Sequence, residues 1–230
     1  MKTIFLATAI ILAPAGVALA ADLGEGSPVA AYDWSGLYAG VHFGHAAGKS
    51  DLFIAGAGFG GTDVNVPLDP SGFIGGVHIG ANHELANRFV LGAEADLAYS
   101  NVDGLGTFTG AGALLKGELK WSGSARLRAG YAFDRTLPYI TAGVAAAKYE
   151  VSVITSSPGG EIPVHDETHL GWTVGAGVEH AFTDRWVARV EYRYSDFGGK
   201  DISVPLLGPG TIANVDLKTH DVRAGLSYKF

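Results

Sequence analysis

The sequence predicts an all-β protein, an eight-stranded antiparallel transmembrane β-barrel of the outer-membrane type. Three observations support this class. Segments of roughly ten residues or more alternate apolar and polar side chains, as membrane strands do. Long and short connections alternate between these segments, and after residue 20 no apolar run approaches the roughly 20 residues of a membrane-spanning helix. A chain that crosses a membrane without such a helix must form a closed barrel, because every backbone polar group has to be paired.

The N-terminal segment 1–20 is expected to be a signal peptide. Lys2 precedes an apolar run at 4–17, and Ala18, Leu19 and Ala20 form a small-residue cleavage site before Ala21. An uncleaved anchor is disfavoured because the run is short for a spanning helix. We therefore expect cleavage between Ala20 and Ala21, a short periplasmic segment at 21–35 and a barrel domain at 36–230.

The first four strands are expected at 36–46, 71–84, 88–100 and 115–133. Each has an apolar row that would face lipid and a polar or small row that would face the lumen. The apolar rows are Leu37, Ala39, Val41 and Phe43; Phe73, Val77, Ile79 and Ala81; Phe89, Leu91, Ala93, Ala95, Leu97 and Tyr99; and Leu119, Trp121, Ala125, Leu127, Ala129 and Tyr131.

The last four strands are expected at 137–153, 168–182, 185–197 and 219–230. The first of them is poorly phased, because residues 140–147 are small or apolar on both faces; there we expect Tyr139, Ala145, Ala147 and Tyr149 to face lipid. The lipid-facing rows of the other three are Leu170, Trp172, Val174, Ala176 and Val178; Trp186, Ala188, Val190, Tyr192 and Tyr194; and Val222, Ala224, Leu226, Tyr228 and Phe230.

The connections give a second signal. Three are tight, at 85–87, 134–136 and 183–184, and four are long, at 47–70, 101–113, 154–167 and 198–218. Outer-membrane barrels have short periplasmic turns and longer extracellular loops, so we expect four extracellular loops and three periplasmic turns. A soluble barrel would bury the apolar rows, but an eight-stranded interior is too narrow for their many aromatic rings. Aromatic residues near the strand ends are expected to form girdles at the two membrane interfaces.

Charged residues recur in the lumen-facing rows and are the main candidates for a site. They are Glu94, Asp96, Lys120, Arg126, Arg128, Glu179, Arg189, Glu191, Arg193 and Arg223, together with Glu118 and Asp221. The favoured interpretation is a salt-bridged filling of a narrow barrel. The alternatives are the lining of a small-solute pore and, least favoured, a catalytic cluster. No His-x-Ser sequence of a barrel lipid hydrolase occurs, so we expect no enzyme.

Metal, cofactor and nucleic-acid sites are not expected. The chain has 0 Cys, which excludes disulfides and Cys-based metal sites. His42 and His78 are expected to face the lumen from neighbouring strands, whereas His165 and His169 are assigned to polar loop surface. The formal net charge is −7, and no stripe of Lys and Arg indicates nucleic-acid binding.

Four segments resemble a known family, the small outer-membrane β-barrel proteins of α-proteobacteria in the Omp25/Omp31/RopB group. They are residues 32–40, 171–179 and 191–198 and the final strand with its terminal Phe230. The resemblance implies an outer-membrane barrel, often named a porin or an outer-membrane immunogenic protein, that contributes to membrane integrity and surface interactions. Tyr228 and Phe230 resemble the signal read by the barrel-assembly machinery, which implies that partner.

The expected function is therefore non-enzymatic: envelope integrity and surface display in the outer membrane. One alternative is a narrow channel for small solutes or ions. Another is a surface adhesin or a receptor for a ligand such as haem, acting through the loops. Expected partners are outer-membrane lipid and lipopolysaccharide, the assembly machinery, and host or peptidoglycan-layer contacts; no cofactor is expected.

Overall fold

The computed structural model describes residues 32–54, 64–68, 70–108, 113–154, 161–203 and 212–230. These residues form β-strands that pair antiparallel in the order β2-β1-β3-β4-β5-β6-β7-β8-β9, and β1 also pairs with β9. No helix among these residues is long and apolar enough to cross a membrane. The expected signal cleavage at Ala20 and Ala21 lies outside the described residues.

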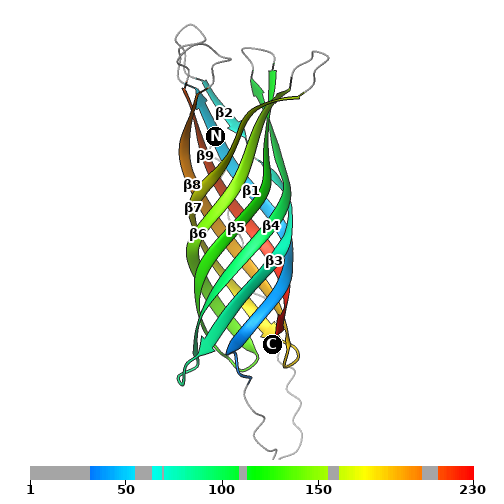
Figure 1. The fold of residues 1–230 in the computed structure, drawn as a ribbon, viewed down its shortest axis with the longest axis vertical. Coiled ribbons are helices and arrows are strands. Elements are labelled where there is room, and N and C mark those ends of the chain that lie inside the picture. The colour runs from blue at the N-terminus through cyan, green and yellow to red at the C-terminus, as the bar shows by residue number, and fades with distance from the viewer. Residues whose placement is uncertain (1–31, 55–63, 69, 109–112, 155–160, 204–211) are drawn as a thin grey trace, which may run out of the picture. The chain divides into compact units, whose positions relative to one another are not determined.

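Eight of the strands form a closed ring, and the short β2 extends it at one end. Figure 1 shows the ring strands inclined to the barrel axis, with the short turns and the C-terminal end of β9 at one end and β2 at the other. The strands are β1 (Gly36–Ile54), β2 (Val64–Leu68), β3 (Ser71–Glu84), β4 (Phe89–Phe108), β5 (Ala113–Tyr131), β6 (Thr136–Ile154), β7 (Glu161–Ala181), β8 (Trp186–Ser203) and β9 (Ile212–Lys229).

The barrel closes between its first and last strands. Pairing of β1 with β9 runs from Tyr38 opposite Lys229 to Ile54 opposite Ala213. The backbone N–H of Phe230 adds a hydrogen bond to the carbonyl oxygen of Leu37. Closure leaves no unpaired strand edge in the ring. The predicted eight-stranded antiparallel barrel is confirmed.

The side chains are arranged inside out relative to a soluble protein. Large apolar residues of the outer surface, such as Leu127, Leu170 and Phe73, are 70–75% exposed. Arginine and glutamate side chains of the inner surface are almost completely buried. An exposed apolar band around a polar interior is the pattern of a barrel surrounded by lipid.

Most strands are longer than predicted, above all β1, β4, β7, β8 and β9, whereas β3 has its predicted bounds. The tight turns lie at their expected places, between Glu84 and Phe89, Tyr131 and Thr136, and Ala181 and Trp186. The long connections, however, are largely strand: Phe108 pairs with Ala113, Ile154 with Glu161 and Ser203 with Ile212. The prediction ended each strand where the apolar row ended. Backbone hydrogen bonding does not depend on that row, so the ladders continue as hairpins beyond the apolar band.

A β-bulge at Lys120 changes which residues of β5 face outward. Trp121 pairs with Lys148 and Leu119 pairs with Tyr149, leaving Lys120 as an extra residue. Leu119 is 5% exposed, so its predicted lipid-facing position is wrong. An extra residue reverses the alternation of everything beyond it, which a strict period of two cannot detect.

The predicted facing of β6 is also wrong. Tyr139, Ala145, Ala147 and Tyr149 are all buried inside the barrel, at 0–7% exposure, whereas Ile140 and Val144 are 65% exposed. Because small residues occupy both faces of β6, the sequence pattern could not show which set of alternate residues faces lipid. The larger branched side chains face lipid, and the Tyr139 hydroxyl donates a hydrogen bond to Glu191 inside the barrel.

Outward-facing aromatic residues form two groups, one towards each end of the barrel. At the short-turn end Trp186 lies 5.2 Å from Tyr228, and Phe89 lies 5.3 Å from Tyr131, measured between ring centroids. At the other end Tyr99 pairs with Trp121, and the Trp172 ring lies 5.4 Å from Tyr194. Amphipathic rings at two levels mark the two membrane–water interfaces.

Candidate functional site

The lumen contains a cluster of buried arginines and carboxylates, which we call the lumen network. Its side chains are no more than 5% exposed. The arginines project from β5, β8 and β9, and the carboxylates from β4, β7, β8 and β9. The members are Arg126, Arg128, Arg189, Arg193 and Arg223 with Glu94, Asp96, Glu179, Glu191 and Asp221. Cations and anions are equal in number, so the charges balance.

Arg126 lies at the centre of the lumen network. One terminal nitrogen, Nη2, lies 2.5 Å from Glu94 Oε1, and the other, Nη1, lies 2.8 Å from Glu191 Oε1. Nη1 also donates to Thr141 Oγ1 at 3.1 Å. Glu94 is on β4 and Glu191 is on β8, on opposite sides of the ring. A single guanidinium therefore bridges two walls of the barrel.

The network extends from this centre in both directions. Towards the long hairpins, Arg193 and Arg223 lie 3.0 and 3.3 Å from Asp96. Towards the short turns, Arg128 lies 2.7 Å from Glu179. Charge-assisted hydrogen bonds of this kind are the strong ones, and buried charges need them to offset lost hydration. The lumen is thus occupied by ion pairs through several layers.

Two tyrosines complete the network, and each faces a glycine. Tyr38 and Tyr139 donate to Glu94 and Glu191, both at 2.8 Å. Tyr38 pairs with Gly80 and Tyr139 with Gly177 on the neighbouring strands. A Cβ atom at Gly177 would lie 2.7 Å from the Tyr139 hydroxyl. Glycine is needed there because any larger side chain would occupy the space of the ring.

Lys120 does not belong to the lumen network, and neither does Glu118. The bulge turns this part of β5, so both side chains face outward and are 35% and 22% exposed. Lys120 lies 2.9 Å from Glu118 and 3.8 Å from Glu150, while Lys116 lies 2.8 Å from Glu118. These pairs stand just beyond Trp121, where the apolar band ends. The predicted position of Lys120 and Glu118 in the lumen is wrong, because the bulge at Lys120 was not predicted.

The histidines contribute no metal cluster among the described residues. His42 and His78 face the lumen as expected, with ring centroids 5.7 Å apart. The His78 ring shares a 2.8 Å hydrogen bond with Ser227, and His42 lies 3.3 Å from Arg223. His169 lies in β7 and is buried, so its assignment to loop surface is wrong. The side chain of His165 lies outside the described residues.

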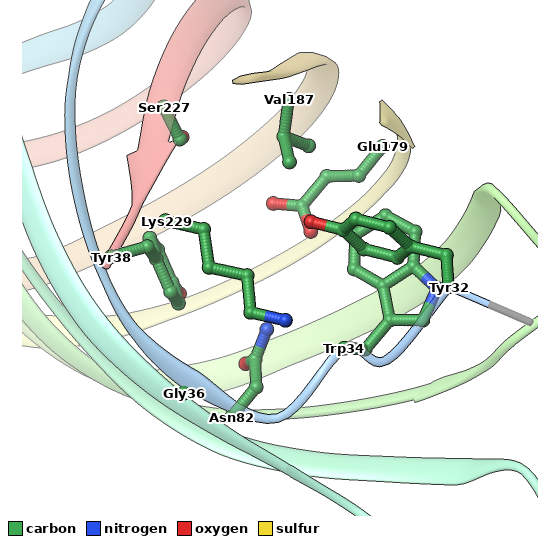
Figure 2. A pocket seen from close by; sticks show the side chains of 9 residues that line it. All are labelled: Tyr32, Trp34, Gly36, Tyr38, Asn82, Glu179, Val187, Ser227 and Lys229. Carbon is green, nitrogen blue, oxygen red and sulfur yellow. The ribbon is translucent and has the colours of Figure 1, made fainter. Parts of the chain in front are cut away.

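The segment Tyr32–Ser35 lies across the lumen at the short-turn end, and we call it the mouth strap. Sequence reasoning placed it in the periplasmic segment 21–35 and gave it no site. Yet Tyr32 and Trp34 are 7% and 3% exposed. Figure 2 shows their rings beside Glu179 and Lys229, around a small cavity that Tyr38 and Ser227 also line. The sequence feature that could have indicated this segment is the pair of aromatic residues, Tyr32 and Trp34, separated by one residue just before the first strand.

The sequence of the chain matches a family model over nearly its whole length. The model is described as the outer membrane protein beta-barrel domain, and it covers residues 5–230. The 31 kDa outer-membrane immunogenic protein of Brucella melitensis is 34% identical, with 100% of both chains covered. The 25 kDa outer-membrane immunogenic protein of Brucella abortus is 30% identical over 100% of this chain and 99% of that protein.

Two further comparisons agree. The 22 kDa outer membrane protein of Rhizobium leguminosarum bv. viciae is 35% identical, covering 69% of this chain and 67% of that protein. The crystal structure of the outer membrane protein OprG from Pseudomonas aeruginosa covers 87% of this chain and 98% of its own, with a TM-score of 0.56 and 14% identity, which shows the fold alone. All of these proteins are named as outer-membrane proteins, and the Brucella relatives also as immunogenic proteins; none of the four names describes an enzyme. The chain belongs to the outer membrane protein β-barrel family, in the group that contains the 25 and 31 kDa Brucella immunogenic proteins, and it is a protein of the outer membrane.

Proposed function

We propose that this protein is a closed, non-conducting barrel that strengthens the outer membrane and carries hairpins at the cell surface. The observation that carries the proposal is the lumen network. Arg126 bridges Glu94 and Glu191 from opposite walls, with side chains 0–1% exposed. Barrels of about eight strands are filled by their side chains, whereas aqueous channels appear at about 16 to 18 strands. The narrow-channel alternative would require these ion pairs to separate.

Conductance in planar lipid bilayers tests the closed lumen. We expect the folded wild-type protein to give no discrete openings, because buried ion pairs occupy the centre of the lumen. Folding is checked by heat-modifiable gel mobility of the same sample. As a comparison, the double variant Arg126→Ala/Glu94→Ala removes a pair from the centre and is expected to admit ions. Reproducible openings of the wild type, with amplitudes altered in that variant, would support the channel instead.

Surface display is supported by the hairpins that extend beyond the apolar band. The β4–β5 ladder continues past the Tyr99–Trp121 pair as far as Phe108 and Ala113. Loops on a rigid scaffold are common sites of surface interaction, and relatives of this chain are named for their immunogenicity. We assign this end to the cell exterior, because outer-membrane barrels place their longer connections there.

A variant with a shortened β4–β5 hairpin tests surface display and envelope integrity separately. Replacing residues 104–117 by a two-residue turn leaves the bulge and the apolar band in place. We expect the variant to restore detergent resistance to a deletion strain as well as the wild type does, and to lose recognition by antisera raised against whole cells. Failure to restore resistance despite normal insertion would show that integrity depends on the hairpin, contrary to the proposal.

A further inference from the structure

We propose that the mouth strap, Tyr32–Ser35, is a plug that closes the short-turn mouth of the barrel to water, separately from the lumen network. The closed lumen proposed above rests on the ion pairs at the centre. The plug is a second closure, made by residues that precede the first strand. Its support comes from polar tethers, an apolar seat and the cavity behind it.

Polar tethers fix the strap to two sides of the mouth. The backbone N–H of Trp34 donates to Glu84 Oε2 at 2.9 Å, and the N–H of Glu84 donates to Ser35 Oγ at 3.0 Å. The Trp34 indole N–H donates to the carbonyl oxygen of Asp134 at 3.0 Å. Glu84 ends β3, whereas Asp134 lies in the β5–β6 turn. The strap therefore spans the opening instead of lying along one wall.

An apolar seat receives the two aromatic rings. The adjoining layer of the lumen contains the charged residues Arg128 and Glu179, but at this mouth Val90, Leu137 and other inward-facing residues are apolar and no more than 5% exposed. Tyr32 and Trp34 pack among them as one cluster, completed by Val90, Ala132, Leu137, Ala181 and Val187. These residues come from β4, β6, β7 and β8 and from the turn after β5. The two aromatic rings fill this ring of apolar side chains and so remove its apolar surface from water.

Two cations lie close to the Tyr32 ring. Lys229 Nζ lies 4.9 Å from the ring centroid and also donates to the carbonyl oxygen of Asp33. Arg135 lies 5.5 Å from the same centroid. Burial, with Glu179 adding to it, raises the pKa of Tyr32 to about 12. A phenol is neutral at physiological pH even at its ordinary pKa, and burial here favours the neutral form further.

The cavity behind the strap shows what the plug separates from solvent. It has a volume of about 20 Å³ and is lined by Trp34 and Glu179 together with Tyr38 and Ser227. A space of this size holds about one water molecule. Without the strap, the layer containing Glu179 and its partner Arg128 would face bulk water directly.

A single cysteine at Ser227 tests the plug, since the chain has 0 Cys. Ser227 is 2% exposed and lines the cavity. In folded protein we expect Ser227→Cys to react slowly with a charged, water-soluble thiol reagent. Adding Trp34→Ala should speed labelling at least tenfold, because the cavity then opens to solvent. Glu84→Ala, which removes a tether but no ring, should give a smaller increase and serves if Trp34→Ala does not fold.

Two reference thiols make the result specific. Asp184→Cys, at an exposed turn of the same end, should label equally fast with and without the strap change. Ser195→Cys lies in a second cavity beyond the lumen network, beside Arg193 and Arg223, and should stay slow in both backgrounds. An unchanged Ser227→Cys rate in folded strap variants would overturn the plug. Faster labelling at Ser195→Cys as well would also overturn it, by showing that the whole barrel has loosened. Neither result depends on wild-type conductance, which tests the closed lumen.

Discussion

Replacing Arg126 by alanine is expected to lower the free energy of unfolding by about 3–5 kcal/mol. The change removes the guanidinium shared by Glu94 and Glu191 and leaves two buried carboxylates with fewer partners. An uncompensated buried charge costs more than the ion pair itself contributes, because its hydration is lost and not replaced. Reversible urea unfolding in lipid vesicles, followed by tryptophan fluorescence, measures the difference.

The matched control is Arg135→Ala. Arg135 also forms an ion pair, with Asp184 at 2.7 Å, but the two side chains are 35% and 85% exposed. Exposed pairs contribute about 0–1 kcal/mol and an exposed cation–π contact, here with the Tyr32 ring at 5.5 Å, about 0.5–1 kcal/mol, so this variant should lose clearly less stability than Arg126→Ala. A second comparison adds Glu191→Gln to Arg126→Ala; neutralising the stranded carboxylate should recover part of the loss. Equal effects of Arg126→Ala and Arg135→Ala would mean that the lumen is hydrated rather than packed.

Replacing Leu127 by arginine is expected to destabilise the inserted barrel by about 2–4 kcal/mol. Leu127 faces outward with 71% of its surface exposed, between Tyr131 and Trp121 of the two aromatic groups. An arginine there would place its charge near the midplane of the bilayer, where hydration is lost. The same vesicle unfolding assay measures this cost.

Leu97→Arg provides the depth control. Leu97 is also outward and 56% exposed, but Tyr99, two residues along β4, belongs to the aromatic group at the long-hairpin end. The arginine can therefore reach the interface, and the cost should be smaller than at Leu127, approaching the roughly 0–1 kcal/mol of interfacial sites. Equal costs at the two positions would contradict the depth assigned to the apolar band.

The fold was predictable because the apolar row is repeated strand by strand and the turns between strands are short at one end. Prediction failed where that row carries no information. In β6 the small residues around Ala145 gave no phase, and the tyrosines were wrongly assigned to lipid. At Lys120 one extra residue turned Leu119 from the lipid face to the lumen. This β-bulge is a feature of the backbone that no residue type in the sequence clearly indicates. The strands also continue beyond the apolar band, where apolar and polar side chains no longer alternate and the strand ends could not be predicted.

The site was predictable as a set of residues but not as a set of contacts. Charged residues at alternate positions of β4, β5 and β8 identified the lumen, since the opposite face must suit lipid. Which arginine meets which carboxylate depends on the stagger of strands across the ring, which no local pattern encodes. The mouth strap was missed for a related reason. Its seat is assembled from the ends of several strands, so Tyr32 and Trp34 resemble ordinary flanking residues until the barrel is closed.

The lumen network also bears on how the strands choose their alignment. A slip of two residues between neighbouring strands keeps every apolar side chain on the lipid face, so hydrophobicity alone cannot distinguish it from the native pairing. Such a slip would move one partner of each cross-strand ion pair by roughly 7 Å. Arg126 could then no longer reach both Glu94 and Glu191, and several charges would be stranded together. The buried charges thus raise the free energy of barrels with a shifted strand register above that of the native barrel. The apolar outer surface alone cannot distinguish these barrels.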